Sequence, residues 1–181
     1  MMFRVTGLRD RFRMRTFNFA VLKNHKNPII IEKFKFPLLA KGQVLVKIFY
    51  SGICRSQLME KLGKRGKDKW LPHALGHEGS GKVIDAGKGV KKVKIGDNVI
   101  LSWIKGKGIE TGGFKIRNIS NKVINFGPVT TLGNYTIVSE NRVFLKPKKM
   151  NFKEAVLYGC AIPTGAGIIF NELNIKKNDS V

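Results

Sequence analysis

The sequence predicts a mainly β fold, a β-barrel with a few short helices. Two observations support this prediction: the apolar residues fall in many short β-favouring runs, and frequent glycine turns separate the runs. With 181 residues and a hydrophobic content of 43%, the chain is long enough to bury a substantial core.

The expected strands follow one another through most of the chain. They cover residues 17–22, 29–36, 43–50, 81–84, 98–103, 135–138 and 142–145. Turn-forming residues separate several of them, among them the polar segment 24–28 and the glycines at 87, 89 and 96. Residues 105–133 have no clear period, and we expect a long, partly ordered excursion there.

Short helices are expected after the third strand and near the C-terminus. Residues 55–62 favour a helical turn. Asn151 with Glu154 three positions later is typical of a helix N-terminus, and residues 155–157 continue that helix. A second helix is expected to start at Thr164 and to include the apolar residues 168–170.

Composition limits the classes of function. The chain has 34 Lys and Arg against 12 Asp and Glu, a net charge of +22 that could attract nucleic acid. The lysines are spread in ones and twos without a recognisable nucleic-acid motif, so nucleic-acid binding is kept only as the less favoured alternative. No apolar run is long enough to span a membrane. Two widely separated cysteines cannot form a disulfide framework, which indicates a reducing, cytoplasmic setting.

Three residues offer the donors that zinc prefers. Cys54 and Cys160 are the two cysteines, and His77 lies in the glycine-rich segment 76–81 beside Glu78. Two thiolates and one imidazole suit a catalytic zinc, which takes three protein ligands and keeps one open position. Taken alone, the pattern leaves other readings open. Each cysteine is more often a buried inert thiol, and His77 is as often a packed core histidine as a ligand.

The contexts of these residues, taken together, resemble the zinc-dependent alcohol dehydrogenases of the medium-chain dehydrogenase/reductase superfamily. The similarity extends from about Met14 to the C-terminus and rests on segments 52–56, 76–81, 96–99, 159–160 and 164–167 in that order. It implies a GroES-like, partly open barrel in which Cys54, His77 and Cys160 hold one catalytic zinc. It also implies hydride transfer between an alcohol or aldehyde and NAD or NADP.

The same resemblance assigns roles to four more residues. Ser56 would take the alcohol proton into a relay, and Glu78 would tune the site; the plainer interpretation of Glu78 is a hydrogen-bond acceptor beside the ligands. Arg55 would contact a phosphate of the cofactor, and Thr164 would contact its nicotinamide.

Three departures from the family pattern carry expectations. Gln57 stands where many relatives have an acidic residue that orients the histidine ligand, so we expect the residues around the ligands to support the zinc more weakly, or that support to come from elsewhere. Met59 replaces a histidine that finishes the proton relay in some relatives. Residues 105–133 contain no cysteine, so we expect one zinc and no second, structural zinc.

The resemblance also divides the chain. Residues 1–13 would be a basic tail, residues 14–170 the GroES-like zinc-binding catalytic domain, and residues 171–181 the start of a linker into a dinucleotide-binding domain. The glycine-rich phosphate loop of such a domain is absent from the sequence. We therefore expect a truncated polypeptide that is inactive alone, self-associates through exposed residues 168–170, and forms a homo-oligomer when full length. The alternative is a non-catalytic metal-binding or interaction module of the same fold.

Overall fold

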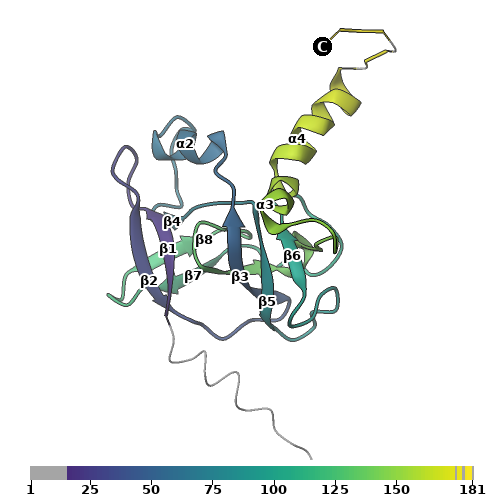
Figure 1. The fold of residues 1–181 in the computed structure, drawn as a ribbon. Coiled ribbons are helices and arrows are strands. Elements are labelled where there is room, and N and C mark those ends of the chain that lie inside the picture. Colours follow the sequence, from purple (N-terminus) through teal and green to yellow (C-terminus); the bar gives the residue numbers. More distant parts are fainter. Residues whose placement is uncertain (1–15, 174, 177, 181) are drawn as a thin grey trace, which may run out of the picture.

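Two curled five-stranded sheets form the body of the fold, as the computed structural model shows (Figure 1). The structure describes residues 16–173, 175–176 and 178–180. The first sheet has the order β2-β1-β4-β8-β7. Its strands are β1 (Thr16–Leu22), β2 (Ile30–Lys35), β4 (His73–Ala74), β7 (Phe114–Arg117) and β8 (Val123–Phe126).

The second sheet has the order β10-β6-β5-β3-β9, and all its neighbouring strands are antiparallel. Its strands are β3 (Gln43–Ser51), β5 (Gly79–Ala86), β6 (Asn98–Leu101), β9 (Tyr135–Ser139) and β10 (Val143–Leu145). The pairing of β3 with β5 brings Ser51 opposite Gly79. The end of β3 and the start of β5 therefore lie side by side, and these two strand ends carry Cys54 and His77 on the adjoining loops.

Each sheet contributes its own hydrophobic cluster to the core. One consists mainly of valines from the second sheet, and Val44, Val46, Val83 and Val99 in it are fully buried. The other is aromatic and lies on the first sheet, where the rings of Phe34 and Phe126 meet edge to face at 5.3 Å. Both clusters follow from the alternation of apolar residues along strands, so the mainly β fold is confirmed.

The helical segments gather at one end of the barrel (Figure 1). Helix α2 (Arg55–Lys61) follows β3, and the C-terminal helical segments are α3 (Phe152–Ala155), the 3₁₀ segment η2 (Val156–Gly159), α4 (Ala161–Gly167) and the π segment η3 (Ile168–Glu172). A further 3₁₀ segment, η1 (Glu140–Arg142), connects β9 to β10. Asn151 caps α3 as expected, because its side-chain oxygen accepts a hydrogen bond from the Glu154 N–H at 2.8 Å.

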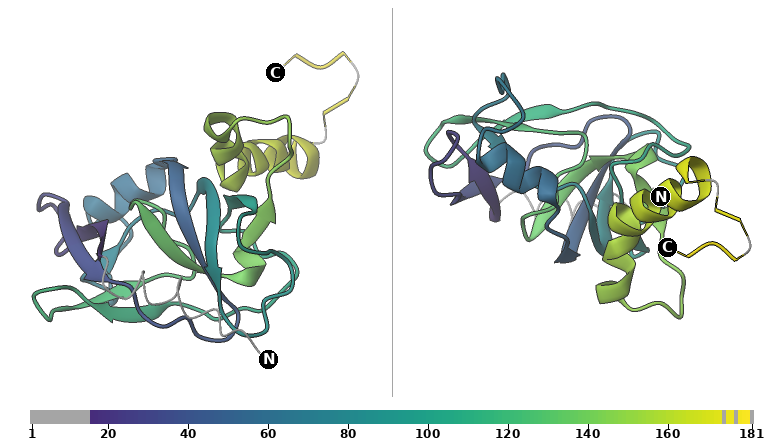
Figure 2. Two further views of the ribbon diagram at one scale, coloured as in Figure 1. Left: turned by 60° about the horizontal axis from the view of Figure 1, so that its bottom comes forward. Right: turned by 90° about the horizontal axis from the view of Figure 1, so that it is seen from above.

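The C-terminal helical arm points away from the barrel (Figure 2). Apolar side chains on it are exposed, among them Ile168, Ile169 and Phe170, which exposes 81% of its surface. No described helix is both long and apolar enough to cross a membrane. The expected basic tail, residues 1–13, lies outside the described residues.

The expectation for residues 105–133 was wrong in one respect. This segment contains the antiparallel pair β7 and β8, in which Phe114 lies opposite Phe126. Each strand has only four residues, too few for its alternation to be clear in a sequence rich in glycine and asparagine. The pair is stabilised by non-local packing, since Ile116 and Ile124 are buried in the aromatic cluster.

Candidate metal centre

The three predicted ligands come from three separate loops at the helical end of the barrel. Cys54 lies between β3 and α2, His77 between β4 and β5, and Cys160 between η2 and α4. The loop before His77 depends on Gly76, whose φ of +103° is in the left-handed region. A Cβ at this position would also lie 2.8 Å from the Thr131 backbone nitrogen, so only glycine fits here.

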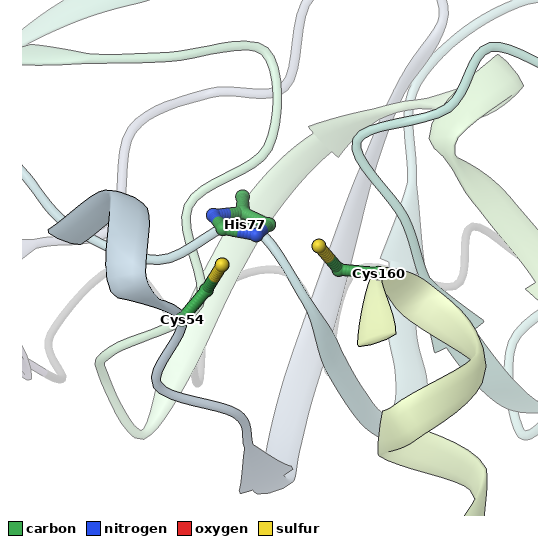
Figure 3. A group of neighbouring side chains, drawn as sticks. All are labelled: Cys54, His77 and Cys160. Carbon is green, nitrogen blue, oxygen red and sulfur yellow. The ribbon is translucent and has the colours of Figure 1, made fainter. Parts of the chain in front are cut away.

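The ligand atoms of Cys54, His77 and Cys160 all lie within 4.8 Å of one another. Figure 3 shows both sulfur atoms and one ring nitrogen of His77 facing a common centre. Zinc bonds of 2.0 to 2.3 Å in a tetrahedral site place neighbouring ligand atoms roughly 3.5 Å apart. Small side-chain adjustments are enough to reach that spacing, and the donor set matches the softness of zinc, so the residues present fit the ion.

The surroundings of the three ligands act differently on their protonation. Backbone hydrogen bonding from Ser56 lowers the pKa of Cys54, whereas burial raises the pKa of Cys160. Burial, together with the charge of Arg65, lowers the pKa of His77 and so favours its neutral form. A neutral imidazole is the form that binds a metal, but the thiol of Cys160 must lose its proton when an ion enters.

Glu78 lies buried behind the ligands, with 4% of its surface exposed. Its carboxylate Oε2 accepts a hydrogen bond from the Ala161 N–H at 3.3 Å, directly after Cys160. Two glycines make room for it: a Cβ at Gly52 would lie 2.3 Å from Glu78 Oε1, and one at Gly159 would lie 2.8 Å from Glu78 Cβ. Burial raises the pKa of Glu78. The hydrogen bond to the Ala161 N–H and the close approach of Gly52 and Gly159 show that the Glu78 side chain fixes the position of the Cys160 loop.

The backbone of Glu78 is held by residues that no sequence motif singles out. Its carbonyl oxygen accepts hydrogen bonds from Thr131 Oγ1 at 2.8 Å, Ser51 Oγ at 3.2 Å and the Gly52 N–H at 3.2 Å. Serine and threonine are common residues, so Ser51 and Thr131 do not stand out in the sequence. They support the His77 loop only because the fold brings segments far apart in sequence together.

A cavity of about 580 Å³ reaches His77 from the side of Gln57 and the basic loop that follows α2. Its acidic groups are already paired. Glu60 binds Arg65 at 3.0 Å, and Asp68 accepts a hydrogen bond from His73 Nε2 at 2.9 Å. Neither Cys54 nor Cys160 lines this cavity, so it adjoins the ligand cluster at His77 and does not enclose it.

The sequence profile of the family described as the alcohol dehydrogenase GroES-like domain matches residues 40–148, more than half of the chain. The chain belongs to this family. The assignment confirms the resemblance to the zinc-dependent alcohol dehydrogenases of the medium-chain superfamily and the GroES-like barrel that it implied.

The chain is also similar to curated proteins that are named for an enzymatic activity. An S-(hydroxymethyl)glutathione dehydrogenase from Photobacterium damsela subsp. piscicida is 29% identical over 167 residues, which covers 78% of this chain and 44% of the relative. One from Escherichia coli (strain SMS-3-5 / SECEC) is 27% identical over 165 residues, with the same coverage. The chain therefore spans less than half the length of these relatives.

Solved structures share the fold. An alcohol dehydrogenase zinc-binding domain protein from Burkholderia ambifaria superimposes with a TM-score of 0.78 at 23% identity, covering 92% of this chain and 51% of that one. Benzyl alcohol dehydrogenase from Acinetobacter calcoaceticus gives a TM-score of 0.74 at 24% identity, with the same coverage.

Ser56, one of the residues that the family pattern singles out, lies beside the ligands. Its Oγ is 3.5 Å from His77 Nδ1, and it hydrogen-bonds Cys54. Thr164 is exposed on α4, with its Oγ1 3.9 Å from Cys160 Sγ, and Arg55 is exposed at the start of α2. Met59 is half-buried on the same helix. The structure thus brings Ser56 and Thr164 to the ligands and leaves Arg55 at the rim.

The structure shows where Gln57 lies, at the position for which we expect weaker support for the zinc or support from elsewhere. Its side chain is buried, its Nε2 is in close contact with His77 Nδ1, and its Oε1 accepts a hydrogen bond from the Cys54 N–H at 2.8 Å. Gln57 therefore takes the place beside the histidine itself. Its carboxamide reaches both loops because position 57 lies in the first turn of α2, directly after Cys54.

Proposed function

We propose that this chain is the catalytic domain of a zinc-dependent, NAD(P)-linked alcohol dehydrogenase, which oxidises an alcohol to an aldehyde or ketone. The observation that carries the proposal is the convergence of Cys54, His77 and Cys160 within 4.8 Å at the end of a GroES-like barrel. Membership of the family and the activities for which the relatives are named support it.

In this proposal Cys54, His77 and Cys160 hold the zinc, which, when bound, supplies a Lewis acid that makes an alcohol hydroxyl more acidic. Ser56 Oγ, which lies between Cys54 and His77, takes the proton that the alcohol loses. Glu78 keeps the Cys160 loop in place through the Ala161 N–H. Because Met59 has no ionisable group, the proton leaves Ser56 by a route that does not use position 59.

The proposed cofactor, NAD or NADP, would lie over the helical end of the barrel. Arg55 on α2 and Thr164 on α4 are both exposed there, on the two elements that flank the ligands. Arg55 would contact a phosphate, and Thr164 would contact the nicotinamide. Most of the cofactor would bind to a second, dinucleotide-binding domain, which residues 171–181 would join to the catalytic domain of residues 14–170.

The difference in length between this chain and its relatives leads to further proposals. Since the relatives are about twice as long, turnover of an alcohol or aldehyde would require the longer polypeptide, and a homo-oligomer is expected of that form. The proposed location is the cytoplasm, on the evidence of two widely spaced, free cysteines. Nucleic acid is not an expected partner.

An open coordination position separates a catalytic site from a merely structural one. We would replace zinc with Co(II) in the purified chain and record the visible absorption spectrum while trifluoroethanol or imidazole is added. The proposal predicts thiolate-to-cobalt charge-transfer bands and a shift of the d–d bands with added ligand. Charge-transfer bands with d–d bands that do not respond would favour the non-catalytic metal-binding module.

A further inference from the structure

The side chain of Gln57 lies between two of the three ligand loops and has 5% of its surface exposed. Its Oε1 accepts a hydrogen bond from the Cys54 N–H at 2.8 Å, and its Nε2 is in close contact with His77 Nδ1. The ring nitrogen on the α2 side is therefore Nδ1, which leaves Nε2 as the nitrogen that faces the two sulfur atoms (Figure 3). One buried carboxamide thus determines the surroundings of His77.

A carboxamide has one oxygen that accepts hydrogen bonds and one NH₂ group that donates them. Because the oxygen is engaged by the Cys54 N–H, the NH₂ group of Gln57 faces His77 Nδ1, and Nδ1 must accept. A neutral imidazole with an accepting Nδ1 carries its proton on Nε2. The nitrogen that should bind the metal is then protonated.

Binding of a metal through Nε2 requires the proton on Nδ1, which must then find an acceptor. Two donors, the His77 Nδ1–H and the Cys54 N–H, would compete for the single oxygen of Gln57, whichever way its amide is turned. Ser56 Oγ lies 3.5 Å from Nδ1, at the far limit of a hydrogen bond, and is a weak substitute. Each entry of metal therefore costs one buried hydrogen bond.

We propose that Gln57 is a positioning residue that holds metal-free His77 in the Nε2–H tautomer and thereby weakens the metal site, and that a carboxylate at position 57 would remove this cost. The proposal rests on the proposed zinc-binding function of the same residues. A glutamate has the same length and two accepting oxygens, one for each donor. The chain thus holds its zinc less tightly than its ligand set allows.

The first test determines the tautomer in metal-free protein. Nitrogen-15 NMR of histidine-labelled chain, with the His77 signal assigned by its loss in His77→Asn, distinguishes the protonated from the unprotonated ring nitrogen. We expect Nε2–H in the native chain and Nδ1–H in Gln57→Glu. An Nδ1–H tautomer in the native metal-free chain would overturn the proposal.

The second test measures zinc affinity by competition with a chromophoric chelator. We expect Gln57→Glu to bind zinc about 10- to 100-fold more tightly than the native chain. The added negative charge is controlled by repeating the substitution in a His77→Cys background, because cysteine is a zinc ligand without a second N–H. An equal gain in both backgrounds would assign the effect to charge and contradict the proposal.

The two tests separate this inference from the proposed function. If neither the native chain nor Gln57→Glu binds zinc while the tautomers are as expected, the zinc-dependent function fails and the hydrogen-bond account of Gln57 stands. If zinc binds and the substitution changes neither the tautomer nor the affinity, the role of Gln57 fails and the proposed function is untouched.

Discussion

Replacement of Glu140 by glutamine should destabilise the fold without touching the candidate metal centre. Glu140 follows β9, and 3% of its surface is exposed. Its Oε1 accepts hydrogen bonds from the N–H groups of Lys91 at 2.6 Å and Lys92 at 2.8 Å, and its Oε2 accepts one from Ile109 at 2.9 Å. One carboxylate thus fastens two loops to the barrel.

The magnitude follows from the number of accepting oxygens. A hydrogen bond to a charged group contributes about 1.5 to 3 kcal/mol, a neutral one contributes about 1, and an unsatisfied buried donor costs about 1 to 3 kcal/mol. In Glu140→Gln two bonds become neutral and the Ile109 N–H faces an NH₂ group. We therefore expect a loss of about 3 kcal/mol in the free energy of unfolding.

The dependence on pH provides a second check. Burial alone would raise the pKa of Glu140, but hydrogen bonds from the backbone of Ile109, Lys91 and Lys92 outweigh it and lower this pKa. A carboxyl group with a lowered pKa stabilises the fold above its unfolded-state pKa, about 4.3, and this stabilisation is lost as the pH falls through the folded-state value. The difference between the native chain and Glu140→Gln should therefore shrink in acid.

The assay is urea unfolding followed by tryptophan fluorescence, with a chelator present so that metal binding adds no stability. Exposed Glu154 provides the matched control Glu154→Gln, which removes the same charge from the surface. A loss for Glu140→Gln no larger than the control's, or one that persists unchanged in acid, would refute the reasoning.

Three further substitutions or conditions test other parts of the account. Gly159→Ala should lower zinc affinity and stability together, since a Cβ there would lie 2.3 Å from the Leu101 carbonyl oxygen and displace the Cys160 loop; chelator competition that shows native affinity would contradict this. Thr131→Val removes the 2.8 Å hydrogen bond to the Glu78 carbonyl oxygen and should cost about 1 to 2 kcal/mol in urea unfolding; an unchanged midpoint would show that the bond is dispensable. Zinc affinity should rise with pH above neutrality, because burial raises the pKa of the Cys160 thiol and its proton must leave; calorimetry in buffers of different ionisation enthalpy should detect proton release, and its absence would count against Cys160 as a ligand.

Most of the barrel could be predicted from the sequence because its longer strands alternate clearly. The run 43–50 became β3, and the run 17–22 became β1. The strands β4, β7 and β8 could not be predicted in this way. They have two to four residues, and their stability comes from neighbours distant in sequence, as in the parallel contact of His73 with Asn125.

In the candidate site, too, some residues could be selected from the sequence and some contacts could not. Donor chemistry and motif order selected Cys54, His77 and Cys160, and the structure brings them together. Their role as zinc ligands stays a prediction, as do the roles of Ser56 and Thr164. The sequence singled out position 57 through the family resemblance, but it indicated neither the contacts of Gln57 nor any role for Thr131. Gln57 and Thr131 act through directional hydrogen bonds to groups that only the folded chain brings within reach.

The metal content of the purified chain tests the central claim most directly. Inductively coupled plasma mass spectrometry after dialysis against trace zinc should find about one zinc per native chain. It should find almost none in Cys54→Ser, His77→Ala and Cys160→Ser variants that keep the native circular dichroism spectrum. A native chain without bound metal, or folded variants that retain a full equivalent of zinc, would contradict the account.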